Sequence, residues 1–401
     1  MPTLTLKNVK TLDGGVTTLS LSGPKEAVIE GEGKLLAMPA FIDLVNFCTP
    51  GKTYKEDFMT GAKAALAGGV THVFDMPSSE PLTTTESRLD KKITLIQDQL
   101  REVKIPLRCD FFYGADDKNV DEFGRVKKKI IGIKVSPLLL DNDRALSQIF
   151  EMCAQEELIV AIHAEDPKLI AINQDLYKSS ADVKTHSLIR SRDTALRATQ
   201  KGLYFAEEYS AEVYFCHVST KEEIDLIRKA KRSQQLVWLD IAPHHLFLTE
   251  DDYDTLGTKV QTDPPLRTRE DQWALWEAVI DKTADTITSN HTPHTLQEKE
   301  RPYPQSPSGL PGIETRLPLL LNAASEGKLS LERIVELCRT NLESIFHLDP
   351  NEDLVLVDLS LEKTVRDEDQ KTKCGWSPYA GRKLKGWPLY TILKGEAFRV
   401  G

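Results

Sequence analysis

Apolar and polar residues follow one another along most of this chain in a repeating pattern. Eight nearly continuous apolar runs are separated by longer segments with the apolar spacing of amphipathic helices. The runs begin at Ala40, Thr71, Arg108, Ile131, Leu158, Glu212, Val237 and Thr286. Parallel strands whose outer face is covered by helices are typically apolar throughout. We therefore predict an α/β fold in which eight strand–helix units close into a TIM-like (β/α)8 barrel.

An open, doubly wound parallel sheet is the alternative arrangement for the same pattern. Such a sheet usually carries a glycine-rich fingerprint directly after its first strand. The first run continues as AFIDLVNFCTPG, which contains no such fingerprint. The sequence therefore favours the closed barrel.

Both chain ends carry shorter apolar segments of the kind that forms strands. They are Thr3–Val9, Thr17–Leu21 and Ala27–Ile29 before the barrel, and Leu354–Leu359, Leu389–Leu393 and Ala397–Val400 after it. A polar stretch near Lys363–Lys373 interrupts the second group. We predict a small composite β-domain built from residues 1–38 and 349–401, with the barrel spanning residues 39–348.

Composition and charge argue against a nucleic-acid partner and against a membrane-spanning segment. The 401 residues carry 51 Lys and Arg against 61 Asp and Glu, a net charge of −10 that is spread along the chain. A nucleic-acid surface needs clustered basic residues, and the one cluster, Lys127–Lys129, is typical of a solvated helix end. No apolar run approaches the roughly 20 residues of a membrane span, and the N-terminus lacks a signal-peptide core. Six cysteines without C-x-x-C spacing favour the reducing cytoplasm.

Polar residues stand in unusual places on the predicted strands. Lys134 interrupts the apolar run IGIKVSP, His163 and His217 end two further runs, and Asn290 and His294 follow the last run. A single histidine at a strand end is usually a hydrogen-bonded core residue. Several such groups at one end of successive barrel strands indicate a functional site instead. A lysine within an apolar strand is costly unless it is paired or chemically modified.

Several long segments carry a family resemblance. They include PGKTYKEDFMTGAKAALAGGVTHVFDMP, APHHLFLTEDD, DPPLRTREDQWALWEAV, NHTPHTLQEKERPY and GWSPYAGRKLKGWP. Over nearly its whole length the chain resembles the dihydroorotases of the amidohydrolase superfamily. The resemblance implies a TIM-like barrel with a composite β-domain and a site for one or two zinc ions. It also implies the interconversion of carbamoyl-aspartate and dihydroorotate in pyrimidine biosynthesis.

The resemblance assigns roles to five residues of this chain. Lys134, His163 and His217 match metal-ligand positions, and in active relatives the lysine is often carbamylated and bridges two metals. His294 matches a histidine that faces the substrate, and Arg267 is a possible anion contact. His244 and His245 belong to a family segment in which core hydrogen bonding is a sufficient explanation.

The chain departs from the family at other positions of the site. The first strand reads DLVNFCTP from Asp43, one residue shorter than the usual pattern, and has neither the His-x-His pair nor the following arginine. Asn290 occupies the position of the general acid/base aspartate, while Ser78 and Asp263 replace two asparagines. Without metal, the pKa of water stays near 16 instead of about 7, and an amide cannot transfer a proton. We therefore expect no catalytic residue in this site.

The remaining ligand set is too small for the family's metal centre. Lys134, His163 and His217 form a vestige of the outer metal site, and carbamylation of the lysine needs a metal to hold the carbamate. Cys48 is the one nearby replacement ligand, although a buried free thiol is its simpler interpretation. We expect no cofactor, or at most one zinc ion.

Three functions fit these observations. The first is a dihydroorotase-like protein of de novo pyrimidine biosynthesis that is catalytically inactive and acts as a structural partner of aspartate carbamoyltransferase, with a homodimer as the expected assembly. The second is an active zinc-dependent dihydroorotase, or another cyclic amidohydrolase, with an altered metal site. The third is a small-molecule sensor that uses the vacated pocket through His294 and Arg267.

Overall fold

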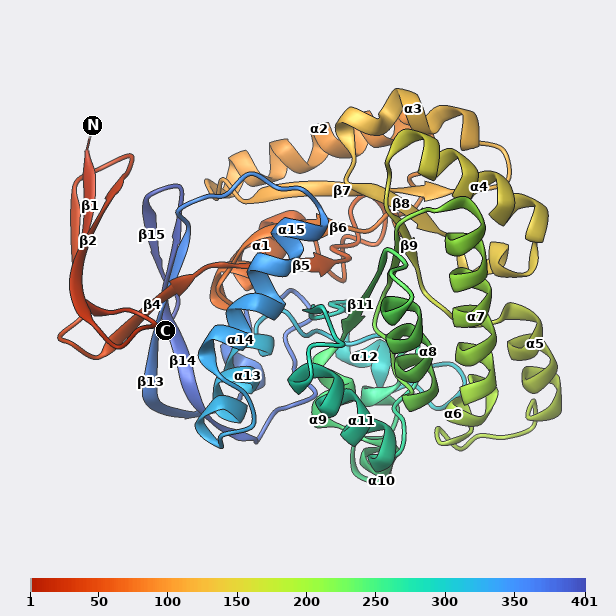
Figure 1. Ribbon diagram of the computed structural model, residues 1–401. Coiled ribbons are helices and arrows are strands. Elements are labelled where there is room, and N and C mark those ends of the chain that lie inside the picture. The colour runs from red at the N-terminus through yellow and green to blue at the C-terminus, as the bar shows by residue number, and fades with distance from the viewer. Residues whose placement is uncertain (1) are drawn as a thin grey trace.

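The chain folds around an eight-stranded parallel sheet that curls on itself (Figure 1). The computed structural model describes residues 2–401, so Met1 of the predicted N-terminal segment lies outside it. The strands follow one another in chain order: β5 (Phe41–Val45), β6 (Val70–Asp75), β7 (Arg108–Ala115), β8 (Gly132–Val135), β9 (Val160–Ile162), β10 (Val213–Phe215), β11 (Val237–Ile241) and β12 (Thr286–Ile287). Each predicted apolar run overlaps one of these strands, so the prediction of eight is confirmed.

The first and last strands of the sheet meet, which closes the barrel. The segment after β12 forms a parallel bridge from His291 to Val45 on β5. The amide of Asn46 donates to the carbonyl of His291 at 3.0 Å. This contact confirms the closed barrel over the open sheet.

Helices cover the outside of the barrel and present apolar side chains to it. The fifteen α-helices within residues 2–401 are α1 (Phe58–Ala67), α2 (Glu86–Val103), α3 (Phe123–Val126), α4 (Asp143–Glu156), α5 (Pro167–Leu176), α6 (Thr185–Ile189), α7 (Arg192–Tyr209), α8 (Lys221–Arg232), α9 (Pro243–Phe247), α10 (Tyr253–Leu256), α11 (Arg269–Ile280), α12 (Leu296–Lys299), α13 (Arg316–Ser325), α14 (Leu331–Val335) and α15 (Asn341–Ile345). In α8, for example, Thr220 and Glu223 form a capping box, and Ile224 and Ile227 are buried. None of the helices within residues 2–401 is long and apolar enough to cross a bilayer.

A second sheet is assembled from both chain ends, as predicted. It contains β1 (Thr3–Lys10), β2 (Val16–Ser22), β3 (Ala27–Glu30), β4 (Leu35–Pro39), β13 (Leu354–Thr364), β14 (Lys383–Leu393) and β15 (Glu396–Arg399). The antiparallel pair β4–β13 joins the two ends. The sequence did not indicate β4, and β13 and β14 are longer than the segments predicted there. Figure 1 shows this sheet beside the barrel, away from α5 and α7.

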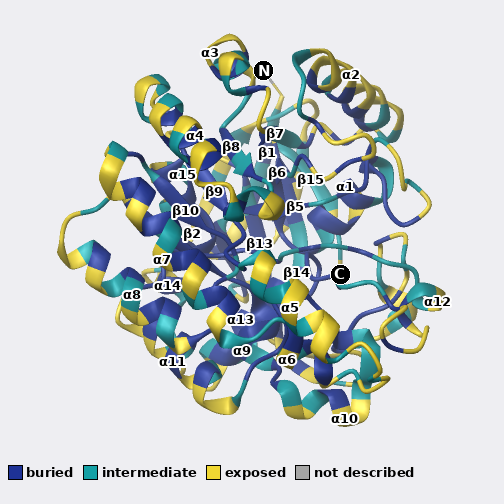
Figure 2. Ribbon diagram, turned by 90° about the vertical axis from the view of Figure 1, so that its right-hand side faces the viewer, coloured by how far each residue is buried: buried dark blue, intermediate teal, exposed yellow. Residues whose placement is uncertain are grey.

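One end of the barrel interior is filled by aromatic side chains. Phe346, which follows α15, meets Phe74, Phe112 and Tyr214 with ring centroids 5.0, 5.8 and 5.3 Å apart. These residues belong to a buried cluster inside the barrel that is separate from the larger core between strands and helices. Figure 2 shows the buried strands within a ring of helices whose outer faces are exposed. Because this end is filled, a cavity can form only at the opposite end of the barrel.

The polar segment between β13 and β14 returns to the barrel and is fixed there by two buried carboxylates. Glu314 accepts hydrogen bonds from the amides of Lys371 and Thr372 at 2.8–2.9 Å. Glu56 accepts from the amide of Lys373 at 3.2 Å. The C-terminal segment therefore contributes to the same end of the barrel as the cavity.

Candidate functional site

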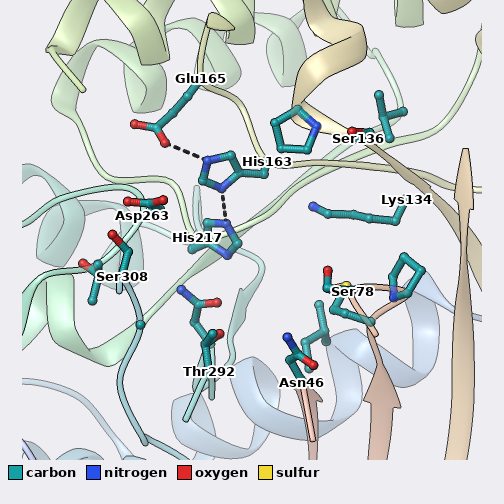
Figure 3. Close-up of a pocket in the computed structure, with 18 of the residues that line it drawn as sticks. Asn46, Ser78, Lys134, Ser136, His163, Glu165, His217, Asp263, Thr292 and Ser308 are labelled. Atoms are coloured by element: carbon teal, nitrogen blue, oxygen red, sulfur yellow. Dashed lines mark hydrogen bonds and ion pairs between the residues drawn. The ribbon is translucent and has the colours of Figure 1, made fainter. Parts of the chain in front are cut away.

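The carboxyl ends of the barrel strands surround a cavity of about 690 Å³. Asn46 follows β5, Ser78 follows β6 and Ser136 follows β8, and all three line it (Figure 3). In a closed parallel barrel all strands end at one rim, so residues far apart in sequence face one space. Much of the remaining wall is apolar, including Leu44 and Leu310. This size and polarity are typical of a small-molecule site.

The three predicted metal-ligand residues are brought together in this cavity. Lys134 lies on β8, His163 directly follows β9, and His217 is the second residue after β10. Nδ1 of His163 and Nε2 of His217 are 2.7 Å apart, a hydrogen bond between the two imidazoles. The Lys134 ammonium points toward this pair in Figure 3 and donates to Sγ of Cys216 at 3.2 Å. The structure thus brings the three residues together, and their role as metal ligands stays a prediction.

Two residues of the rim have left-handed backbone conformations. The φ angle is +42° at His217 and +49° at Asn290. Residues other than glycine adopt this region in only a few per cent of cases, roughly, and asparagine and histidine are among those that do so most often. The contacts of the His217 ring and amide hold it in place: the amide donates to Asp240 at 3.2 Å.

A buried ionic network backs one side of the cavity. Glu165 lies 2.7 Å from Nε2 of His163 and is paired with Arg190. Arg190 also contacts Asp263 at 2.6 Å, and Asp263 lies 2.9 Å from His186. Burial alone would raise the pKa of Glu165, but Arg190 and His163 together hold it below its ordinary value. The pKa of Asp263 is depressed as well, because His186 and Arg190 outweigh its burial.

This network was not predicted from the sequence. Glu165 lies only two residues beyond His163, so a carboxylate beside a strand-end histidine was the available signal. Arg190 precedes α7 in a segment without any strand pattern. Only the folded chain shows that the two residues meet.

The predicted substrate contacts His294 and Arg267 lie behind the wall and do not line the cavity. Nδ1 of His294 is 2.7 Å from Nζ of Lys55, and Nε2 is 2.9 Å from the carbonyl of Ser308. Burial and Lys55 lower the pKa of His294 to about 4. Arg267 donates to the carbonyl of Arg190 at 2.5 Å and to the Ser219 hydroxyl at 3.2 Å. Both side chains are engaged within the protein, so direct contact with a ligand in the cavity does not follow from this placement.

The expectation of hydrogen bonds for His244 and His245 is wrong. All four ring nitrogens are buried and have no hydrogen-bond partner among the described residues. The two rings instead contact each other, with centroids 4.4 Å apart. Burial lowers the pKa of His244 to about 3, so that ring is neutral.

The end of β5 supplies no ligand to the cavity. Phe47 is fully buried, with its ring edge-on to Phe58 and His291 at 5.0 and 5.5 Å. Cys48 does not line the cavity, and burial raises the pKa of its thiol to about 12. A metal binds the thiolate, so this cysteine is poorly suited as a replacement ligand. Leu44, Val45 and Asn46 line the cavity from this strand end, and of these three only Asn46 has a polar side chain.

Asn290 lines the cavity beside a carboxyl group that the sequence analysis did not single out. Asp240, at the end of β11, accepts from the amide and the hydroxyl of Thr288 at 2.8 Å each. Burial raises the pKa of Asp240 to about 7. Asn290 itself has no ionisable group. Asp240 is therefore a second buried carboxyl of the cavity beside Glu165, and it lies on a different strand from the position of Asn290.

These donors do not fit a zinc centre. Within residues 2–401, no group of three or more His, Cys, Asp and Glu side chains is arranged to hold a metal ion. Of the three imidazoles that line the cavity, His163 and His217 hydrogen-bond to each other, and Nδ1 of His291 accepts from the amide of Gly312 at 3.2 Å. Lys134 is not among the residue types that usually bind zinc. Structural and catalytic zinc sites need at least three protein ligands with free lone pairs.

Comparisons with known proteins give a consistent family. No protein-family model matches the chain. A dihydroorotase of Methanosarcina mazei is 32% identical over 402 residues, which cover 92% of this chain and 85% of that protein. A dihydroorotase of Staphylococcus epidermidis is 30% identical over 390 residues, 94% of this chain and 91% of that protein.

Two further likenesses concern a larger protein and the fold. The multifunctional protein CAD of Squalus acanthias is 36% identical over 374 residues, and the matched part is 90% of this chain but only 15% of that protein. The solved structure of L-hydantoinase from Arthrobacter aurescens superposes with a TM-score of 0.88 at 22% identity, covering 99% of this chain and 96% of that one. At this identity the likeness concerns the fold alone.

Proposed function

This chain belongs to the dihydroorotase family, and we propose that it is a member without hydrolytic activity that supports pyrimidine biosynthesis as a structural partner of aspartate carbamoyltransferase. In this proposal the barrel is retained for its shape and surface, and the chemistry is supplied by another protein. We further propose that it acts in the cytoplasm and as a homodimer.

One observation carries the proposal of inactivity: the end of β5 brings no imidazole or carboxylate to the cavity, and after β12 the position of the general acid/base aspartate is Asn290, with His291 as the ionisable residue that lines the cavity there. Val45 and Asn46 line the cavity at the end of β5, and Asn290 lines it after β12. Without a metal, hydroxide at neutral pH is scarce by many orders of magnitude, and loss of a general acid/base costs a further 100- to 10,000-fold, roughly. The two losses act on one site, and either is severe.

The proposed partnership is supported by the relation to a longer polypeptide. In Squalus acanthias the matching region is a small part of a protein named multifunctional. In that protein the matching region is therefore covalently linked to the rest of a much longer chain. In the present chain the same association would form between separate proteins.

The first test is whether the purified chain hydrolyses or forms dihydroorotate. We expect no turnover above the uncatalysed rate and less than one-tenth of an equivalent of zinc per chain, on the order expected for a site lacking three ligands. An active relative purified in the same way is the control. Stoichiometric zinc together with enzymatic turnover would refute the proposal.

The second test concerns the partner. Co-expression with the aspartate carbamoyltransferase of the same organism should give a complex of defined mass by light scattering. Carbamoyltransferase activity and assembly should fall when this chain is omitted. A carbamoyltransferase that is fully assembled and active alone, and that does not co-migrate with this chain, would contradict the partnership.

Asp240 favours a second candidate function, a cyclic amidohydrolase with an altered site. A carboxyl with a pKa of about 7 at the cavity wall has the protonation equilibrium that general acid/base catalysis needs. Both of its oxygens already accept protein hydrogen bonds, which opposes this role. Hydantoin and dihydropyrimidine hydrolysis that is lost in Asp240→Asn would establish this candidate.

A further inference from the structure

The helix α11, on the outside of the barrel in Figure 2, has apolar side chains on two opposite sides. The buried apolar residues of its inner side are Ala274, Leu275, Ala278 and Val279. On its outer side Trp273 and Ile280 are 62% and 60% exposed, and Trp276 lies on the same side between them. A helix that is apolar all round is normally buried. The outer side of α11 is therefore suited to a contact with another molecule.

A groove of about 760 Å³ lies along this outer side, and α9, α13 and the start of β14 supply its other walls. We call it the tryptophan groove, because Trp273 and Trp276 line it. The indole N–H of Trp276 donates to the carbonyl of Leu246 at 2.9 Å, and its ring lies edge-on to Phe247 at 5.4 Å. Nη1 of Arg382 donates to the carbonyl of Phe247 at 3.1 Å. These contacts hold the walls together, so a partner meets a preformed surface and little loss of entropy opposes its binding.

The charge of the tryptophan groove differs in sign from that of the whole chain. Three cations line it, Lys328, Arg382 and Lys383, against the two carboxylates of Glu277 and Glu326. The chain as a whole has 51 basic and 61 acidic residues. Each of the three cations is at least 37% exposed and has a single ion pair at the surface, and such pairs contribute little. The groove therefore favours a partner that brings carboxylates.

We propose that the tryptophan groove binds a helix of another protein that is apolar on one face and carries carboxylates along the edge of that face. Trp273 and Ile280 are seven residues apart, which is about two turns or 10 Å along α11. This distance matches the i, i+7 spacing of apolar side chains on a partner helix in a groove. The carboxylates would face Lys328 and Lys383. The inference goes beyond the proposed function, because the groove shares no lining residue with the barrel cavity and can act whether or not the chain is a hydrolase.

Calorimetry on the full-length chain with two synthetic peptides tests the proposal. Both peptides have about 20 residues, enough for an isolated helix, and carry leucine along one face at the i, i+3, i+4, i+7 spacing. Glutamates flank that face in one peptide, and lysines flank it in the other. We expect the glutamate peptide to bind at least about 10-fold more tightly, because only its charges complement the three cations of the groove. A glutamate peptide that does not bind at about 1 mM, or equal affinities of the two peptides, would overturn the proposal.

Variants of the two exposed residues of α11 locate the contact. Trp273→Ala should weaken binding of the glutamate peptide by about 10-fold or more, because aromatic anchors carry a large share of the binding energy in interfaces, and Ile280→Ala should weaken it less. Ile172→Ala, on α5 at a side chain that is 62% exposed, is the matched control for Ile280→Ala and should have no effect. All three side chains are exposed, so the variants should fold like the unaltered chain. Undiminished binding by Trp273→Ala would overturn the proposal.

A charge reversal tests the complementarity separately. Lys383→Glu should weaken the glutamate peptide and strengthen the lysine peptide, each by about 3-fold, the scale of one exposed ion pair. Lys168→Glu, on α5, is the matched control, since the two lysine side chains are 68% and 67% exposed. If Lys383→Glu changed the affinities of both peptides in the same direction, the proposed charge complementarity would be wrong.

A second copy of the chain is the competing occupant of the groove. Light scattering over a series of protein concentrations compares the unaltered chain with Trp273→Ala. The proposal predicts the same mass for both proteins at every concentration. An assembly of the unaltered chain that dissociates in Trp273→Ala, but not in Ile172→Ala, would show that a second copy covers the groove and would overturn the proposal.

Discussion

At the scale of single residues, the neighbours of a side chain determine whether it faces the cavity or is held within the protein. Lys134, His163 and His217 were recognisable because a charged or imidazole group interrupts or ends an apolar run. His294 does not line the cavity, because its ring is held by Lys55 and the carbonyl of Ser308, and its role as a substrate contact stays a prediction. The sequence shows that His294 follows a strand end. The direction of its ring depends on Lys55, which lies more than two hundred residues away in the sequence.

The substitution Asn290→Asp tests whether one restored carboxylate is enough for catalysis. We expect no dihydroorotase turnover above that of the unaltered chain, because the end of β5 still offers no metal ligand. The measurement is dihydroorotate hydrolysis with added zinc, and the same substitution pair in an active relative (Asp to Asn) serves as the reference. A gain of 100-fold or more, the rough scale of general acid/base catalysis, would show that the metal site is functional.

The buried carboxyl of Glu314 gives a prediction on pH. Burial raises its pKa from 4.5 to about 7 in the folded chain. Between these values the folded state retains a proton that the unfolded chain has released, so the free energy of unfolding falls as pH rises from about 4.5 to about 7. The effect of this one group is at most about 3 kcal/mol.

Glu314→Gln isolates that effect. One amide oxygen can accept both backbone hydrogen bonds that Oε1 now accepts from Lys371 and Thr372. Urea unfolding at pH 5 and pH 8 should show a smaller difference in the variant than in the unaltered chain. An unchanged difference would mean that other groups, such as Asp240, cause the pH dependence.

At the scale of elements, the strands were predictable because each barrel strand lies within a largely apolar run. The interior face packs on the cluster around Phe346, and the outer face packs on helices. β4 was missed because it comes directly before the run at Ala40 and its pairing partner, β13, is more than three hundred residues away. Local pattern contains no information on such a partner.

Phe346→Ala should strongly destabilise the barrel, since the ring contacts three aromatic residues from three different strands. We expect a loss of about 3–5 kcal/mol in the free energy of unfolding. Chemical denaturation measures it, and Leu188→Ala, at a side chain that is 52% exposed, is the control with an expected change below about 0.5 kcal/mol. A small loss for Phe346→Ala would mean that the interior repacks.

At the scale of the whole molecule, the two sheets share one core. Val355 and Val357 of β13 and Leu393 of β14 are buried in the same cluster as barrel residues. The composite sheet therefore covers apolar surface of the barrel.

A fragment of residues 39–348 should for this reason fail to give a stable monomer. Removal of β13 and β14 exposes the barrel surface that Val355 and Val357 cover, and a large apolar patch promotes aggregation. Soluble yield, size-exclusion chromatography and thermal unfolding compare the fragment with the full chain. A monomeric fragment with the full chain's melting temperature would show that the barrel is independent of the composite sheet.

The aromatic cluster around Phe346 also limits how small molecules can reach the cavity. Because aromatic rings fill the other end of the barrel interior, a small molecule can enter and leave the cavity at the end where the strands have their carboxyl ends. Leu138 lies at this entrance, where 76% of its surface is exposed, and it also lines the cavity. A protein bound over Leu138 would block this route. The dissociation rate of a small molecule in the cavity would therefore show whether that protein is bound.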